Sequence, residues 1–410
     1  MRRIFSRYLV LVGLLVNLFA VAFTFYWLSI KIAGTDLYRD GRQFLFGSLD
    51  GVEVASVAPS GAGSINHSLK ALPAGTWFKI HQHVGDSEEV FTRQVHGGAA
   101  FDPLRGRLML FGSDTHSQNW DNSVRFFDMG TLRWSSAYAE DDPTTYRVNG
   151  NGIPVAGSGV ERPWAMHTFD AVEFDPIADK LIIASYPGHM SPKKKWGVNK
   201  ELWRQIQSHP TWAYSVSEDR WEPILNRGIS FFPYAATFDR NRRAVIGVKP
   251  DGFWELAAGA TEWKRLAKGA PYAYHNAAAY DHKRDIVVSF GTHKRANDVW
   301  QFQRGQNSGK KMPTPGIRPP GAKSPPLVYY PGIDRVVALV EHRADGALGS
   351  TETWLYSTED DTWSRLKTAS LPFATGMNYD MVYDPNHELL VLVANAPGDP
   401  VSVWVLKIEA

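Results

Sequence analysis

The stretch Phe101-Asp102-Pro103-Leu104-Arg105-Gly106-Arg107-Leu108-Met109-Leu110-Phe111-Gly112 decides the fold, because variants of it recur six times along the chain. Each copy begins with small residues that run into an aromatic–Asp pair, and a short polar turn and an apolar run follow. A segment with Trp-x-aromatic or Trp-x-Leu comes next, and a second tryptophan typically lies nine residues further on. The pairs are Phe101-Asp102, Phe174-Asp175, Phe238-Asp239, Tyr280-Asp281 and Tyr383-Asp384, with Tyr330-Pro331-Gly332 as an irregular member.

The third copy shows how one repeat divides into strands. Residues 235–238 are small and apolar, and 244–248 form a continuous apolar run, which is typical of a strand buried on both faces. Pro250-Asp251-Gly252 has the composition of a turn, and it leads into 253–256 and then 263–266. Four short strands that repeat every roughly 40 to 70 residues are the signature of a β-propeller blade.

The recurring tryptophans are interpreted as packing between blades, since large aromatic side chains dominate core energetics. Arg125 replaces the third-strand tryptophan in the first copy, and Gly309 replaces the fourth-strand tryptophan in the fourth copy. The outer strand of the fourth copy is therefore weakly specified. The third-strand residues are Trp212, Trp254, Trp300, Trp354 and Trp404, and the fourth-strand residues are Trp134, Trp221, Trp263 and Trp363.

The last copy lacks a fourth strand, and an isolated fourth-strand pattern stands before the first copy. The chain stops at Ala410, soon after Trp404, whereas Gly75-Thr76-Trp77-Phe78-Lys79-Ile80 has no repeat of its own. An N-terminal strand that completes the last blade would close the ring and remove an exposed sheet edge. We therefore predict an all-β, six-bladed propeller of four-stranded blades over residues 75–410.

Two stretches resemble kelch repeats. Residues 108–113 with 122–128 and 131–134 carry the resemblance, as do 287–292 with 297–300. The chain is similar to the galactose-oxidase and kelch group, although Gly-Ser or Gly-Thr replaces the family's double glycine. The resemblance implies the fold far better than a function. A copper-radical site of the galactose-oxidase type needs a Tyr–Cys cross-link and is excluded, because the chain contains no cysteine.

The N-terminus is predicted to anchor the protein in a membrane. Residues 1–7 are basic, and 8–30 form an apolar stretch long enough for one transmembrane helix. Since residues 32–35 match a cleavage site poorly, we expect an uncleaved signal-anchor. The positive-inside rule then places the tail in the cytoplasm and the propeller on the periplasmic or extracytoplasmic side of an inner or plasma membrane. Residues 31–74 are interpreted as a stalk.

Composition narrows the function further. With no cysteine, neither disulfides nor metal–thiolate sites can form. The formal net charge of +2 over 410 residues carries no nucleic-acid signature, so no nucleic-acid partner is expected.

Long, variable connections fall on one rim of the expected ring, between the second and third strands of a blade and between blades. A rigid scaffold commonly carries function in such loops. Residues 138–163 and 191–209 are expected to form a lid or a docking surface there, or to pack onto the rim. Candidates for acid–base chemistry at the channel mouth are His96, His275, Asp170, Tyr234, Tyr379 and Asp380. Further candidates for the binding face are His116, His167, His189, His293, His342, Asn276, Asn378, Trp196 and Trp203.

These residues leave two functions open. The first is a membrane-anchored binding protein, acting as a scaffold or accessory subunit with other membrane or envelope proteins. The second is a carbohydrate-active enzyme of the lyase, hydrolase or mutarotase class, for which a glycan would be the partner. No cofactor and no metal are predicted, because the HExxH spacing is missing from the sequence and convergence of ligands depends on the inferred ring. A divalent metal at the channel mouth is the minor alternative.

Overall fold

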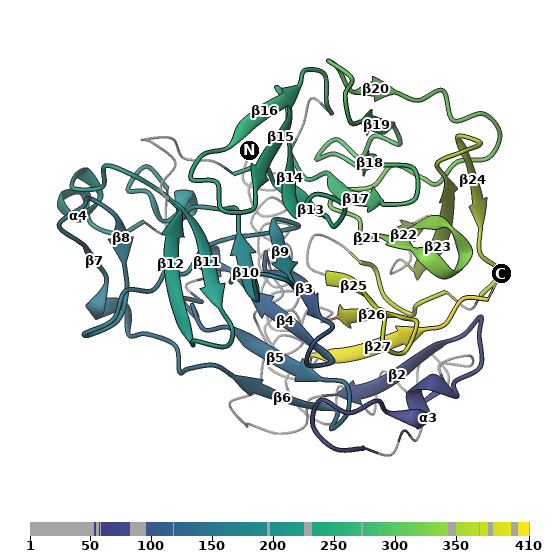
Figure 1. Ribbon diagram of the computed structural model, residues 1–410, viewed down its shortest axis with the longest axis horizontal. Helices are drawn as coiled ribbons and strands as arrows, with labels where there is room; N and C mark the ends of the chain where they lie inside the picture. Colours follow the sequence, from purple (N-terminus) through teal and green to yellow (C-terminus); the bar gives the residue numbers. More distant parts are fainter. Residues whose placement is uncertain are drawn as a thin grey trace, which may run out of the picture. The chain divides into compact units, whose positions relative to one another are not determined.

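Six large sheets form a closed ring (Figure 1). The computed structural model describes residues 53–54, 57, 59–82, 96–117, 119–194, 197–224, 232–271, 274–342, 350–368, 370–375, 380–394 and 401–409. The innermost strands β3, β9, β13, β17, β21 and β25 contact one another in that order, and β25 contacts β3. The predicted six-bladed, all-β propeller is confirmed.

Each blade is an antiparallel sheet whose strands follow one another outward from the channel. The first blade contains β3 (Gly98–Asp102), β4 (Arg107–Phe111), β5 (Arg125–Asp128) and β6 (Arg133–Ser136). The second contains β9 (Val172–Asp175), β10 (Lys180–Ile183), β11 (Thr211–Ser215) and β12 (Arg220–Ile224), and the third β13 (Ala235–Asp239), β14 (Ala244–Lys249), β15 (Gly252–Ala257) and β16 (Lys264–Ala267). The fourth contains β17 (Ala277–Asp281), β18 (Ile286–Phe290), β19 (Val299–Gln303) and β20 (Lys310–Lys311), and the fifth β21 (Leu327–Tyr330), β22 (Arg335–His342), β23 (Ser350–Ser357) and β24 (Thr362–Arg365).

The sixth blade joins the two ends of the propeller. Its inner strands are β25 (Asp380–Asp384), β26 (Leu389–Ala394) and β27 (Ser402–Leu406), and its fourth strand is β2 (Trp77–Gln82). Strand β2 pairs antiparallel with β27, so that Trp77 lies opposite Leu406. The predicted closure by an N-terminal strand is confirmed. The short strand β1 (Glu53–Val54) adds to β2 in parallel.

Part of the segment predicted as a stalk packs against the propeller. The short helix α3 (His67–Lys70) begins at Asn66, whose side chain accepts hydrogen bonds from the Ser68 and Leu69 amides. Leu69 is fully buried in the core between the first and sixth blades. The folded part of the chain thus begins before residue 75, because burying Leu69 offsets the entropy of ordering this segment.

The aspartate of the repeated aromatic–Asp pair closes the turn that follows it. Asp102 accepts hydrogen bonds from the amides of Leu104 and Arg105, at 3.0 and 3.1 Å. Such a side chain stabilises a tight turn by satisfying backbone donors. The equivalent residues Asp175, Asp239, Asp281 and Asp384 are also buried, and each accepts from turn amides.

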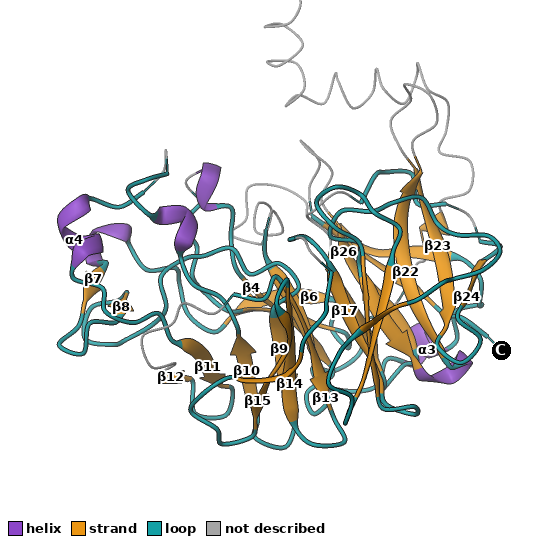
Figure 2. Ribbon diagram, turned by 90° about the horizontal axis from the view of Figure 1, so that it is seen from above, coloured by secondary structure: helices purple, strands orange, loops and turns teal. Residues whose placement is uncertain are grey.

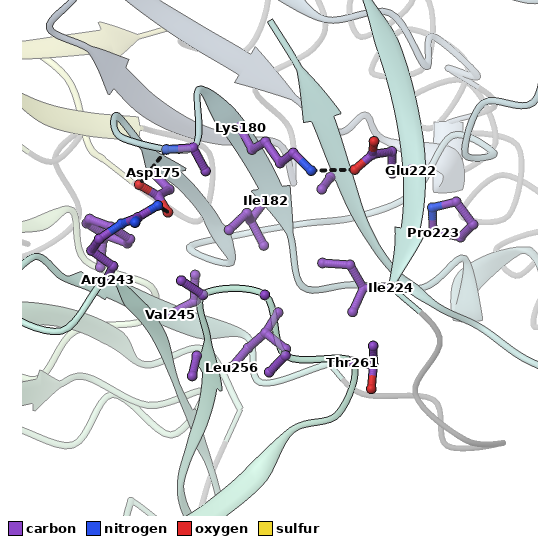
Figure 3. Close-up of a pocket in the computed structure, with 17 residues that line it drawn as sticks. Asp175, Lys180, Ile182, Glu222, Pro223, Ile224, Arg243, Val245, Leu256 and Thr261 are labelled. Atoms are coloured by element: carbon purple, nitrogen blue, oxygen red, sulfur yellow. Dashed lines mark hydrogen bonds and ion pairs between the residues drawn. The ribbon is translucent and has the colours of Figure 1, made fainter.

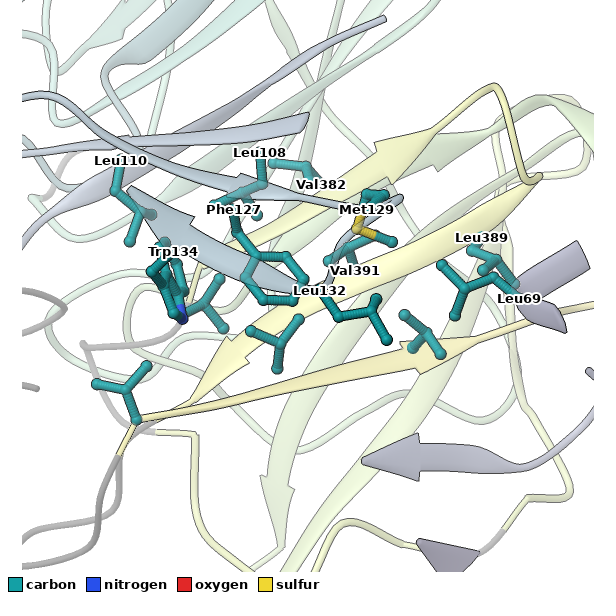
Figure 4. Close-up of a cluster of buried hydrophobic side chains, with 14 of the residues drawn as sticks. Leu69, Leu108, Leu110, Phe127, Met129, Leu132, Trp134, Val382, Leu389 and Val391 are labelled. Carbon is teal, nitrogen blue, oxygen red and sulfur yellow. The ribbon is translucent and has the colours of Figure 1, made fainter. Parts of the chain in front are cut away.

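Neighbouring blades bury their facing side chains against each other. Figure 4 shows one such interface, where Leu108, Phe127 and Trp134 of the first blade pack with Val382 and Val391 of the sixth. The interpretation of the tryptophans as interblade packing holds for the most buried of them. The outer strand of the fourth blade, weakly specified in sequence, has only two residues. Buried tryptophans in these cores are Trp77, Trp134, Trp212, Trp221, Trp354, Trp363 and Trp404.

The predicted basic tail (1–7) and signal-anchor (8–30) lie outside the described residues. Within the described ranges, no helix has both the length and the apolar character needed to cross a bilayer.

Candidate functional site

The mouth of the propeller, where the chain enters the innermost strands, carries side chains on a strained backbone. His96, Phe169, Tyr234 and His275 have φ values of 71°, 48°, 65° and 64°, in the left-handed region that non-glycine residues rarely occupy. The ring of Phe169 lies 5.0 Å from that of His96, 5.1 Å from Tyr234 and 5.0 Å from His275. His96 and His275 therefore share one face of the propeller. Strain at equivalent positions of consecutive blades is typical of a functional region.

Four histidines and one aspartate meet over the first two blades, and we call them the imidazole cluster. The ring of His167 lies 4.2 Å from that of His96, 4.5 Å from His116 and 4.0 Å from His189. One ring nitrogen each of His96, His116 and His167 lie within 4.8 Å of one another. Asp114 places its Oδ1 atom 3.9 Å from Nε2 of His96 and 3.8 Å from Nε2 of His167. The sequence predicted these histidines on one rim, and the ring brings them into contact.

Equivalent loops of two consecutive blades supply the cluster. His116 lies in the 3-10 helix η1 (Thr115–Ser117) and His189 in η3 (Gly188–Met190), each between the second and third strands of its blade. The two 3-10 helices contact each other. His96 and His167 precede the innermost strands of the same blades, so the cluster spans the interface between them.

Close backbone contacts hold the cluster in place. The carbonyl oxygen of His96 accepts hydrogen bonds from the Thr168 and Phe169 amides, at 2.8 and 3.2 Å. The Thr168 hydroxyl donates to the carbonyl oxygen of Phe111 at 2.8 Å. Gly112 has a φ of +108°, and a Cβ atom there would lie 2.4 Å from Oγ1 of Thr168. Only glycine allows this approach, so the loop that carries His116 is fastened to the segment that carries His167.

Burial keeps three of the clustered imidazoles, those of His96, His167 and His189, neutral. Loss of solvation lowers the pKa of His96 to about 4, against a partly opposing effect of Asp114. Loss of solvation likewise lowers the pKa of His189 to about 4, and that of His167 far below its ordinary value. Near neutral pH these rings are uncharged, which is the form that binds a metal or accepts a proton.

Carboxyl groups line the channel beyond the mouth. Oδ2 of Asp170 accepts a hydrogen bond from the Ala278 amide of the fourth blade at 2.8 Å. Asp170 and Asp380 line a small cavity of about 30 Å³, which has room for about one or two water molecules. Burial raises the pKa of both groups well above the usual range, and it raises the pKa of Glu173 to about 8. These groups are therefore held protonated near neutral pH.

The acid–base candidates occupy two layers. His96, Tyr234 and His275 meet around Phe169 at the mouth, whereas Asp170 and Asp380 lie along the channel. Asp170 accepts its hydrogen bond from a backbone amide rather than from an imidazole. Among the described residues, neither His96 nor His275 forms a direct hydrogen bond with Asp170 or Asp380.

The two long excursions of the second blade region fold together as a cap, residues 138–164 and 187–209. The cap contains η2 (Pro143–Thr145), β7 (Arg147–Val148), β8 (Pro154–Val155) and α4 (Lys200–Arg204). Figures 1 and 2 show α4, β7 and β8 beyond β11 and β12 of the second blade. Its own apolar core contains Tyr146, Ala156, Trp164 and Met190, with Leu202, Trp203 and Ile206 against it. Trp203 thus packs inside the cap, and Met190 joins the cap core directly to His189.

Polar bonds fasten the cap to the first blade. The Asn122 side-chain amide donates to Oδ2 of Asp141 and to the Pro163 carbonyl oxygen, both at 2.9 Å. The side-chain oxygen of Asn122 accepts a hydrogen bond from the backbone amide of Asp141 at 2.9 Å. Arg162 completes the arrangement with an ion pair to Asp141 at 2.8 Å. Buried, fully satisfied networks of this kind rigidify a loop.

The remaining candidates are dispersed. Asn276 is buried, and its amide donates to the Ser289 hydroxyl at 3.0 Å, which gives it a structural role. His293 is exposed on the corresponding loop of the fourth blade. Trp196, Asn378, Tyr379 and the side chain of His342 lie outside the described residues.

Two residues of the site were not singled out in the sequence. Asp114 stands two residues before His116, and this Asp-x-His spacing was the available signal. Glu173 lies on the innermost strand β9, and no local motif in the sequence marks it.

A second hollow lies between the second and third blades (Figure 3). Its volume is about 500 Å³, and Ile182, Val245 and Leu256 give it an apolar floor. Ion pairs between Lys180 and Glu222 and between Arg243 and Asp175 lie at its edge. Most of its lining residues lie near the strand ends opposite the mouth, and none of them is a histidine.

Comparison with known proteins adds little to this geometry. No protein-family model matches the chain. No curated protein matches it. Among solved structures, the crystal structure of TolB from Acinetobacter baumannii is similar, with 10% sequence identity and a TM-score of 0.42 over 75% of this chain and 66% of that one. The chain thus spans just under two thirds of that protein's length. The six-bladed fold rests on the strand pairing of this chain itself, and the kelch resemblance stays a prediction.

Proposed function

We propose that this chain is a membrane-tethered, extracytoplasmic binding protein, which acts as a scaffold or accessory subunit of a membrane or envelope complex through the face of its propeller that carries the mouth and the cap. The observation that carries the proposal is the cap. Two long excursions from one side of the ring build an apolar core of their own and adjoin the imidazole cluster. Loops of this length on a rigid scaffold are usually functional.

The mouth also offers an exposed contact point. Tyr274 is 54% exposed, and its ring lies 4.8 Å from that of Tyr234. Tyrosine is enriched in protein interfaces because it combines a large apolar ring with a polar hydroxyl. We expect the partner to cover this part of the mouth. The predicted anchor would hold the propeller near partners in the same membrane.

Site-specific photo-crosslinking in native membranes tests this proposal. A crosslinking amino acid replaces Tyr274 at the mouth in the full-length protein. The matched control replaces Ile177, which is 68% exposed in the first turn of the second blade, at the opposite end of the strands. We expect a discrete adduct from position 274 and none from position 177. Equal labelling from both positions, or an uncrosslinked chain that purifies alone, would contradict the proposal.

A carbohydrate-active enzyme is the second candidate, and stacked aromatic rings at the mouth favour it. The ring of Tyr234 lies 4.1 Å from that of Phe232 and 5.1 Å from that of Phe169, with interplanar angles of 15° and 28°. His275 lies at the edge of this stack, 5.4 Å from Tyr234. An enzyme of this class requires His275→Gln to abolish turnover of a glycan that wild type cleaves or isomerises. A screen in which wild type turns over no glycan would remove this candidate.

A further inference from the structure

The imidazole cluster leaves several buried nitrogen atoms without a hydrogen-bond partner. Both ring nitrogens of His167 are in this state, as are Nδ1 of His96 and Nδ1 of His189. His167 is 1% exposed and His96 is 8% exposed. A buried polar atom left without a partner destabilises the fold, because it loses its hydration with nothing in return. Four such atoms gathered in one cluster are unusual, because phenylalanine would fill the same space without leaving polar atoms unpaired.

The spacing of these nitrogens suits a single ion. The nearest ligand atoms of His96, His116 and His167 lie within 4.8 Å of one another. Around a tetrahedral zinc ion with bonds of about 2.0–2.1 Å, ligand nitrogens lie about 3.4 Å apart. Small side-chain movements close that difference. Asp114 and His189 stand next to the three rings, and either supplies a fourth ligand or orients the others.

The donor set also selects the class of ion. Calcium and magnesium prefer cages of oxygen atoms, whereas this site offers imidazole nitrogens with one carboxylate. Imidazole suits zinc, copper, nickel and iron, and soft thiolate ligands are excluded because the chain has no cysteine. Three histidines with room for a further ligand are typical of an accessible zinc site.

We propose that His96, His116 and His167 bind one divalent first-row transition-metal ion at the mouth, with Asp114 or His189 as an additional ligand. This metal site lies on the same face as the proposed binding surface. Binding of the ion does not require the protein partner. The ion would also link the first and second blades, because each contributes ligands. Lys323 near His96 and Lys194 near His189 are positive charges that would oppose such an ion.

Metal titration of the purified full-length protein, without a polyhistidine tag and stripped with a chelator, tests this site. Zinc and cobalt salts alone are the probes, with calorimetry for zinc and visible absorption for cobalt. We expect one ion per chain, and cobalt bands of a four- or five-coordinate site. His167→Phe removes two nitrogens while keeping a ring, and it should weaken binding at least about tenfold.

The matched control is His209→Phe in the cap. His209 also has a buried Nδ1 without a partner, but its ring contacts are with Tyr186 and Trp203 rather than with the cluster. The His209→Phe variant should bind zinc with the same affinity as the wild type. Should His167→Phe not fold, His116→Gln on the half-buried loop replaces it with the same expected loss.

Two outcomes overturn the metal site. The first is a folded wild type that takes up no stoichiometric ion, and the second is a cluster variant that binds as wild type does. Neither outcome touches the crosslink expected from position 274, so failure of the metal site is distinguishable from failure of the proposed binding function.

Discussion

Arg105 of the first blade forms a two-point ion pair with Asp179 of the second blade, in which its Nη1 and Nη2 atoms lie 2.7 and 2.8 Å from the two carboxylate oxygens. Arg105 stands three residues after Asp102, and its Nη1 atom also contacts that aspartate at 3.0 Å. The same arrangement joins Arg242 to Asp285 and Arg284 to Asp334. In the first, third and fourth blades the turn therefore does two things, because its aspartate closes the turn and its arginine fastens the next blade.

Removal of this link should destabilise the ring. Arg105→Ala is expected to lower the free energy of unfolding by about 1–2 kcal/mol, since the pair is bidentate but its arginine is one-third exposed. Urea denaturation measures the change. Arg133→Ala, at an exposed arginine of the outer strand β6, should stay within about 0.5 kcal/mol of wild type. Equal effects of the two substitutions would contradict the role of the pair.

The closing strand should contribute strongly to stability through Trp77. This side chain is 3% exposed, and its Nε1 atom donates to the Thr353 hydroxyl at 3.1 Å. Trp77→Ala should cost about 3–5 kcal/mol, because it leaves a large cavity between the fifth and sixth blades. Trp77→Phe keeps most of the packing, so it should cost distinctly less. A thermal melt in which the two variants coincide with wild type would show that β2 is not needed for closure.

Glu173 should make the propeller less stable as pH rises. Its pKa is raised by burial to about 8 in the folded chain, compared with 4.5 for an ordinary glutamate. Its stabilising contribution is complete below about pH 4.5 and is lost progressively as pH rises toward 8. Glu173→Gln, which has no proton to lose, should therefore melt higher than wild type at pH 8, and the gain should shrink toward pH 5.

The exposed Glu140 provides the control for that measurement, since Glu140→Gln should leave the melting temperature unchanged at both pH values. A Glu173→Gln gain that does not vary with pH would indicate a packing effect instead of a titration.

His209 should have the opposite dependence on pH. Burial in the cap lowers its pKa to about 4, compared with 6.5 for an ordinary histidine. The unfolded chain thus binds this proton first, so stability is complete above about pH 6.5 and falls as pH drops toward 4. His209→Phe keeps a ring beside Tyr186 and Trp203, and it should lose less stability over this interval. Parallel melting curves for wild type and variant between pH 7 and 4 would refute the expectation.

Close packing at Gly112 should control the geometry of the imidazole cluster. Gly112→Ala would place a methyl group against Thr168 on a backbone that favours glycine, which should cost about 1–3 kcal/mol. NMR signals of the His167 and His116 rings should shift in this variant. At Gly259, also left-handed but with open space around its Cβ position, alanine should leave those ring signals in place.

Local pattern was sufficient for the parts of this protein that repeat. The aromatic–Asp pair, the apolar run and the spaced tryptophans each report on one strand or turn, and the isolated pattern at 75–80 indicated closure of the ring. These strands and turns could be predicted because hydrophobic patterns and turn-forming residues are local signals that extend over only a few residues. The linker boundary could not be placed in this way, since Leu69 is buried by contacts with distant blades.

The sequence by itself determined the ring and the face on which the histidines lie, because each innermost strand begins at the same end of the propeller. Only the tertiary structure decided which of them touch. His96, His116, His167 and His189 meet because two consecutive blades bring equivalent loops together, whereas His293 remains exposed on another blade. Distances of a few ångströms between side chains depend on how blades pack and how the loops close. No local spacing records that information, because these contacts join residues that are far apart in the sequence.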